Sequence, residues 1–113
     1  MIEFFIIGNL GADAVMNETT DKKKIINFAV CHSEQWRNRE GNKEEKKHWV
    51  DCAYFSDSPE LLEMLKKGTQ VYAKGSPSVK VHVPKAGGDP VAVQYLRVSK
   101  MEVLSKKKRE EPI

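Results

Sequence analysis

Alternating apolar and polar positions predict a chain built mainly of β-strands. The first expected strand covers residues 2–7, and both of its faces are apolar: Ile2, Phe4 and Ile6 on one, Phe5 and Ile7 on the other. Such a strand needs a partner on each face, and in so short a chain a second copy of the protein can supply one. We therefore expect homo-oligomerisation through residues 2–7, with the glycines of residues 8–11 ending the strand in a tight turn.

Two further strands joined by a long polar hairpin are predicted next. Residues 12–23 are polar and are expected to form a loop. Residues 24–34 and 48–55 alternate in polarity and are expected to be strands. The intervening residues 37–47 contain no apolar side chain, which predicts an extended hairpin tip in solvent.

A helix is predicted at one place only. Asp57, Ser58 and Pro59 provide a capping residue and an early proline, and residues 66–68 bring positive charge and a glycine to the expected end. Leucines at helical spacing between these signals would plug one end of a barrel: Leu61, Leu62 and Leu65. Strands are expected again at residues 69–75, 79–83 and 91–104, with a turn at residues 84–90.

The order of these elements predicts the fold class. Three strands, one helix and then further strands are the layout of an all-β, five-stranded antiparallel Greek-key barrel of the OB type, with the α-helix between strands three and four. Residues 1–104 are expected to form this one domain, and residues 105–113 a short charged C-terminal tail. A chain of 113 residues leaves no room for a second domain.

Charge narrows the choice of partner. The chain has 19 basic and 16 acidic side chains, a formal net charge of +3, and 15 of the basic residues are lysines. Lysine is a mobile point charge that suits phosphates in any sequence context, whereas the planar fork of arginine reads a fixed geometry. An anionic partner is therefore permitted, and we expect a nucleic acid to be bound without sequence selectivity.

Cysteine use and the absence of targeting signals indicate the compartment. Cys31 and Cys52 lack a paired spacing, which is typical of a reducing environment. No apolar run approaches the about 20 residues that a membrane span needs, and the N-terminus has neither the basic segment nor the cleavage site of a secretory signal. A cytoplasmic, nucleoid-associated protein without membrane contact is expected.

The chain shows no arrangement typical of an enzyme. A nucleophile with its base, a carboxylate cluster and a phosphate-binding loop are all missing from the sequence. His48 and Cys52 would share a strand face, but two ligands without a third are ordinarily core residues. Residues 87–90 are expected to be a hairpin turn. We therefore predict no catalytic activity, no metal and no cofactor.

The aromatic residues are the most informative constellation. Trp36 and Trp49 stand at the two shoulders of residues 37–47, and Phe55 shares a strand face with Trp49 and Asp51. Flat rings beside mobile positive charge suit single-stranded nucleic acid, since every base has a stacking face and every nucleotide a phosphate. The alternative is that the tryptophans pad a subunit interface or the barrel rim. The lysines expected to follow the backbone are Lys24, Lys43, Lys47, Lys74 and Lys80.

Several ordered blocks resemble bacterial-type single-stranded DNA-binding proteins. They are Gly8-Asn9-Leu10-Gly11, Phe28-Ala29-Val30, Ser33-Glu34-Gln35-Trp36, Trp49, Phe55 and the run from Lys67 to Gly75. The resemblance implies an OB-fold protomer that pairs through its first strand, assembles into a homotetramer and wraps single-stranded DNA over aromatic side chains. It also implies that Trp36, Trp49 and Phe55 are the stacking residues.

Two positions depart from the family's pattern, and the chain resembles a short form without the family's long acidic C-terminal tail. His82 stands where a fourth aromatic residue falls, and Asp51 stands where a basic residue is more usual. Both changes imply weaker binding or a shifted path. Residues 110–113, Glu-Glu-Pro-Ile, retain in miniature the acidic ending through which the family recruits replication and repair proteins, and we treat them as a hypothetical recruiting tip.

The predicted function is sequence-tolerant binding of single-stranded DNA, which coats and protects exposed strands during replication, recombination and repair. One alternative is a dimeric OB-fold accessory protein of the primosome type that bridges proteins and binds DNA secondarily. Another is an OB-fold nuclease, which the lack of a clustered carboxylate and arginine site disfavours.

Overall fold

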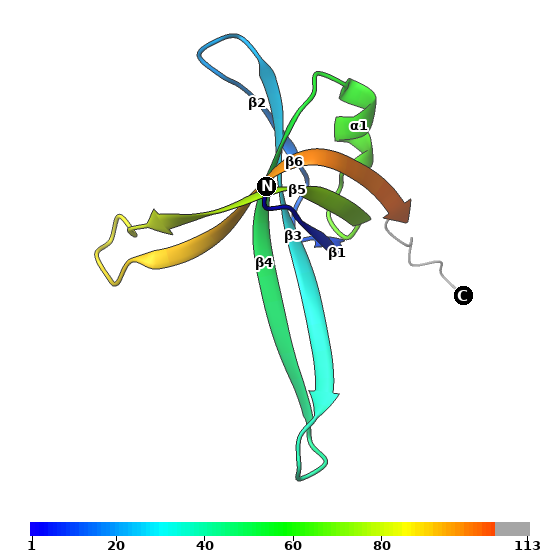
Figure 1. The fold of residues 1–113 in the computed structure, drawn as a ribbon, viewed down its shortest axis with the longest axis vertical. Coiled ribbons are helices and arrows are strands. Elements are labelled where there is room, and N and C mark those ends of the chain that lie inside the picture. Colours follow the sequence, from blue (N-terminus) through cyan, green and yellow to red (C-terminus); the bar gives the residue numbers. More distant parts are fainter. Residues whose placement is uncertain (106–113) are drawn as a thin grey trace.

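The computed structural model describes residues 1–105 as strands and one short helix (Figure 1). In chain order the elements are β1 (Phe4–Leu10), β2 (Val15–Glu18), β3 (Lys24–Arg37), β4 (Lys43–Phe55), α1 (Pro59–Met64), β5 (Gln70–His82) and β6 (Val91–Ser105). The all-β class with a single helix after the fourth of six strands follows from this order. Within residues 1–105, no helix is long and apolar enough to cross a membrane.

Five of the strands close into a barrel. The hydrogen-bonded order is β1-β5-β6-β4-β3-β2, and β1 also pairs with β3, so that β2 is left outside the ring. Pairing is antiparallel everywhere in the ring except between β4 and β6, which are parallel. The expected five-stranded barrel is confirmed, but the expectation that it is antiparallel throughout is corrected at this pair. A closed ring with an odd number of strands cannot alternate direction all the way round.

The barrel interior is filled by the inward residues of every barrel strand. Ile26, Val30, Val71 and Leu96 are fully buried, together with Leu65 just after the helix. Such side chains each gain roughly 1.5–3 kcal/mol on leaving water. The alternation expected for residues 24–34 is confirmed, because it points Ile26 and Val30 into this core.

The helix is shorter than predicted. Ser58 caps it by accepting a hydrogen bond from the backbone N–H of Leu61 at 3.2 Å, and Pro59 occupies its first turn. It ends at Met64, so the lysines of residues 66–67 lie beyond its last turn. Of the three leucines expected to plug the barrel, only Leu65 is fully buried. Leu61 and Leu62 are partly buried and pack against the core.

The first strand runs through the segment predicted to be a turn. Gly8 lies inside β1, where it pairs with Val71 of β5. A Cβ atom there would collide with the carbonyl oxygen of Cys31 on β3. Gly8 therefore serves a close approach between strands rather than a change of direction, and the strand covers Phe4–Leu10 instead of residues 2–7.

Polar segments predicted as loops turn out to be partly strand. Residues 12–23 contain β2, and residues 37–47 are reduced to a turn at residues 38–42, in which Asn38 Oδ1 accepts hydrogen bonds from Glu40 N and Asn42 N at 3.0 Å each. Residues 76–78, between two predicted strands, belong to the continuous β5. A two-stranded ribbon with both faces in water needs no apolar side chain to be a strand, which is why hydropathy does not detect it.

Two long ribbons leave the barrel (Figure 1). The β3–β4 arm ends at residues 38–42, and the β5–β6 arm runs from Gly75 to a turn at residues 83–90. Ser105, the first residue of the predicted tail, still pairs with Gln70 in β6. The rest of that tail, with the hypothetical recruiting tip at residues 110–113, lies outside the described residues.

Candidate nucleic-acid interface

The outward face of β4 presents Trp49, Asp51 and Phe55, with the buried Ala53 between the last two, and we call these four residues the β4 strip. Alternate residues Val50 and Cys52 point into the core, so strand geometry turns Trp49 and Phe55 outward. Trp49 is 51% exposed and Phe55 is 42% exposed. Neither ring is sealed in the interior, and both are accessible to a flat ligand.

Strand β6 adds a cation and a phenol that the sequence analysis did not select. Tyr95 lies opposite Asp51, and Arg97 lies opposite Ala53, in the parallel β4–β6 pair. The Arg97 guanidinium carbon is 5.2 Å from the centroid of the Phe55 ring, within cation–π range. No local pattern in residues 91–104 could place these side chains beside β4, because the parallel pairing depends on closure of the barrel.

A glycine supports the tryptophan of the strip. A Cβ atom at Gly11 would lie 2.5 Å from Cζ3 of Trp49, so the indole rests against bare backbone there. The contact is made by the six-membered ring of the indole, and the residue as a whole remains 51% exposed. Gly11, which was predicted to belong to a tight turn, therefore packs against the ring of Trp49.

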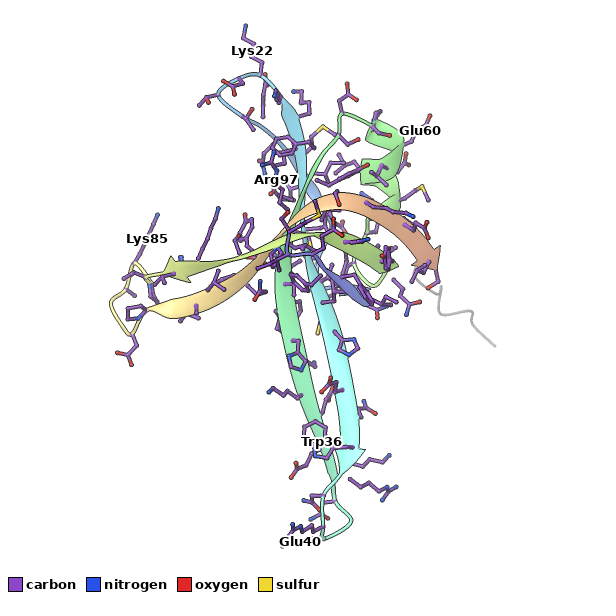
Figure 2. The ribbon with its side chains drawn as sticks, viewed as in Figure 1. Lys22, Trp36, Glu40, Glu60, Lys85 and Arg97 are labelled. Atoms are coloured by element: carbon purple, nitrogen blue, oxygen red, sulfur yellow. The ribbon has the colours of Figure 1, made fainter. Side chains whose placement is uncertain are left out.

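Trp36 does not join the β4 strip. The β3–β4 register is unbroken from Ile25↔Phe55 to Arg37↔Lys43, and it pairs Trp36 with Glu44. Since side chains alternate along a strand, Trp36 belongs to the opposite face of the ribbon from Trp49. It is 44% exposed and lies near the far end of the arm (Figure 2).

The predicted lysines are distributed over four regions, of which the β5–β6 arm with Lys80 is described below. Lys24 adjoins the end of the strip beside Ile25 and forms an ion pair with Glu18 at 3.1 Å. Lys43 and Lys47 are exposed on the β3–β4 arm. Lys74 lies on β5, opposite Phe5 on β1, and forms an ion pair with Glu3 at 3.2 Å.

The β5–β6 arm carries the remaining two predicted residues. The Lys80 ammonium lies 4.2 Å from the centroid of the Tyr95 ring, so this lysine points toward the β6 flank of the β4 strip. His82 is exposed at the end of β5 and pairs with Val91. The structure therefore brings Lys80 toward the strip and leaves His82 on the arm.

A hollow opens beside Asp51. It has a volume of about 420 Å³, and polar groups from four strands and a loop line it: Asp13, Asn17, Asn27, Asp51 and Tyr95. Its lining contains neither lysine nor arginine. Among residues 1–105, no ion pair or side-chain hydrogen bond involves the Asp51 carboxylate.

The inward neighbour of Asp51 is an inert thiol. Burial, and secondarily the negative charge of Asp51, raise the pKa of Cys52 from 9.0 to about 12. Cys31 is partly exposed opposite Trp49. In the part of the chain that the structure describes, no group of three or more histidine, cysteine, aspartate or glutamate residues is placed to hold a metal ion.

This contrast predicts the alkylation pattern. Because the thiolate is the reactive species, we expect iodoacetamide at pH 8 to modify Cys31 in the native protein and Cys52 only after denaturation, as counted by mass spectrometry. Cys31→Ser is the matched control and should leave the native chain unmodified. Since the folded-state pKa of Cys52 is raised, its thiol favours the folded state below pH 9.0, and this contribution is lost as the pH rises toward about 12. Rapid modification of Cys52 in the native protein would contradict its burial and its raised pKa.

A second exposed surface lies on β1. Phe5 is 61% exposed and Ile7 is 41% exposed, and the Phe5 ring packs 5.6 Å from that of Tyr72 on β5. A hollow of about 700 Å³ adjoins these residues and reaches His32 and Trp49. The apolar outer face predicted for the first strand is therefore present.

Comparison with known proteins places this architecture among its relatives. Residues 1–104 match the "Single-strand binding protein family". The "Single-stranded DNA-binding protein 1" of Xylella fastidiosa (strain 9a5c) is 32% identical over 104 residues, which cover 90% of this chain and 76% of that protein. The "Single-stranded DNA-binding protein" of Rhizobium meliloti (strain 1021) is 31% identical over 94 residues, 80% of this chain and 54% of that protein.

Two solved structures share the fold. "Plasmodium falciparum SSB complex with ssDNA" has a TM-score of 0.72 at 20% identity, and covers 93% of this chain and 96% of its own. A small single-stranded DNA-binding protein from Streptomyces coelicolor has a TM-score of 0.73 at 13% identity, with 90% and 93% covered. Both likenesses support the fold of this chain.

Proposed function

Because the chain belongs to the single-strand binding protein family, we propose that it binds single-stranded DNA in a sequence-tolerant manner and protects exposed strands during replication, recombination and repair. The proposed role is binding rather than catalysis. We place it in the cytoplasm, with replication and repair proteins as further partners.

The β4 strip is the observation that supports this proposal. Two large rings, Trp49 and Phe55, are held half in solvent by strand alternation, and a guanidinium lies over one of them. Base–aromatic stacking of this kind tolerates any sequence, because each base has a π-face. We propose that unpaired bases stack on Trp49 and Phe55 while phosphates approach Arg97 and Lys80.

The arms extend the proposed path beyond the barrel. Trp36 and Lys43 lie on the β3–β4 arm, and His82 lies on the β5–β6 arm. Because Trp36 faces away from the strip, its base would belong to a separate part of the bound strand. We leave Lys74 out of the proposed path because it forms an ion pair with Glu3.

The apolar face of β1 supports a proposal of self-association. Phe5 and Ile7 together with Tyr72 form an outward apolar surface, and the hollow beside it reaches Trp49 at one end of the β4 strip. Isologous pairing of such a surface with a second copy would remove it from water. We propose a homo-oligomer through β1.

A titration tests the proposed partner and forces. We expect single-stranded dT oligonucleotides to quench the tryptophan emission and duplex DNA of the same length to bind far more weakly. The logarithm of the affinity should fall linearly with the logarithm of salt concentration, by about 0.7 for each neutralised phosphate of a single strand. Lys80→Gln should lower this slope by about 0.7, whereas Lys74→Gln, the matched control, should leave it unchanged. An affinity that does not depend on salt would contradict the proposal.

A further inference from the structure

The hollow beside Asp51 has the dimensions of a small-ligand site. Its volume of about 420 Å³ falls within the range of roughly 300–1,000 Å³ found for pockets that hold organic ligands. Of the β4 strip only Asp51 lines this hollow, and Trp49 and Phe55 stand two and four residues from Asp51 along the strand. Alternate residues of a strand are about 6.6 Å apart, so a base stacked on Trp49 can present its edge to Asp51.

The charge of Asp51 is unusual in a proposed phosphate-binding surface. Its carboxylate has no cationic partner among residues 1–105, and its field reaches the interior, since it contributes to the raised pKa of Cys52. An ionised carboxylate only accepts hydrogen bonds, and it repels phosphates. Its favourable contact on a DNA strand must therefore be with the donors on a base edge.

The neighbouring polar groups narrow the choice of base. Asp13 accepts a hydrogen bond from the backbone N–H of Lys67 at 2.8 Å, so it holds a loop in place. Asn27 on β3 points to the same outer face as Asp51. It stands two residues before Ala29, and Ala29 lies opposite Asp51. The amide of Asn27 forms no side-chain hydrogen bond within residues 1–105. A carboxylate acceptor therefore lies beside a free amide donor.

Only guanine matches this pair of groups. Its Watson–Crick edge carries two adjacent donors, N1–H and N2–H, followed by the acceptor O6. Adenine and cytosine each put a ring-nitrogen lone pair next to their single amino group, and thymine flanks its one N–H with two carbonyl oxygens. These lone pairs would face the second carboxylate oxygen of Asp51 and repel it. The edge is free for this contact only in an unpaired strand.

We propose that Asp51 and Asn27 form a guanine-preferring subsite in which the base stacks on Trp49. Asp51 accepts from guanine N1–H and N2–H, and the Asn27 amide donates to O6. This inference rests on the proposed function and adds one position of base preference to an otherwise sequence-tolerant surface. It also gives a reason for a carboxylate in the middle of the strip.

Competition between short oligonucleotides tests the subsite. We compare dT oligomers that carry isolated dG, deoxyinosine or dA substitutions at the same positions. Since a bidentate base contact discriminates strongly, we expect wild-type protein to prefer the dG oligomer over the dT oligomer by about fivefold or more. Deoxyinosine lacks the N2 amino group and should fall between them. The dA oligomer, which controls for purine stacking, should show no gain over dT beyond twofold, as an order-of-magnitude bound.

Variants separate the subsite from general binding. Asp51→Asn should bring the dG/dT ratio to about one while raising affinity for dT, because a repulsive charge is removed. Asn27→Ala should reduce affinity for the dG oligomer alone. Glu63→Gln on α1 removes the same charge away from the strip and should leave the ratio unchanged. Binding of dT without a dG preference in wild type, or a preference that survives Asp51→Asn, would overturn the subsite alone; failure to bind dT at all would overturn the proposed function.

Discussion

Trp49→Ala is expected to weaken binding of single-stranded dT oligonucleotides by about 5- to 150-fold, which corresponds to about 1–3 kcal/mol. The indole is 51% exposed and rests on Gly11, so it is held in place for stacking before the ligand arrives. Replacement by alanine removes the π-face and leaves the charges of the surface unchanged. Fluorescence anisotropy of a labelled oligonucleotide measures the loss.

Phe55→Ala should cost a similar factor, and the double variant should lose the product of the two. Six residues of strand separate these rings by about 20 Å, a distance at which free-energy changes usually add. Trp49→Phe should restore most of the affinity, because it keeps an aromatic face. Met64→Ala, at an exposed residue of α1, is the control for a general loss of apolar surface.

The thermal unfolding midpoint of each variant has to be measured beside its affinity. Loss of the Trp49 ring leaves space above Gly11, and a fall in affinity that only followed a fall in stability would not support stacking. Unchanged affinity of a well-folded Trp49→Ala protein would refute the role of the strip.

Placing lysines at Phe5 and Ile7 is expected to dissociate the oligomer into monomers of 12.9 kDa. In an isologous interface each substitution occurs twice, so the double variant brings four like charges together across β1. Both residues point outward, so the substitutions leave the barrel core intact. Analytical ultracentrifugation at several concentrations measures the mass.

Val81→Lys is the matched control for this experiment. Val81 is 67% exposed on the β5–β6 arm, and a lysine there should leave the mass unchanged. If the wild-type protein itself sediments at 12.9 kDa, the proposed β1 interface is wrong. A wild-type dimer would favour the accessory-protein alternative, whereas a tetramer would favour the strand-coating role.

Local patterns in the sequence were sufficient to predict much of the fold and part of the candidate site. The alternation of residues 48–55 is sufficient to turn Trp49 and Phe55 outward and Cys52 inward, because the twofold period of a strand is a local property. Ser58 and Pro59 identify the helix start for the same reason. Trp36 is a different case. It stands an even number of residues after the buried Ile26, so an unbroken strand would place both side chains on the same face. The predicted strand ended before Trp36, however, and its face could not be assigned.

The sequence by itself determined a chain of β-strands with one helix, two outward rings on a single strand and an apolar first strand, since each depends on spacing between near neighbours. Only the tertiary structure decided that Arg97 lies within cation–π range of Phe55, that Gly11 supports Trp49, and that Asn27 and Tyr95 meet Asp51 around a hollow. These contacts join residues from separate strands, and they follow from closing five strands into a ring. Closure makes β4 and β6 parallel neighbours, and no short-range pattern in either strand specifies that pairing.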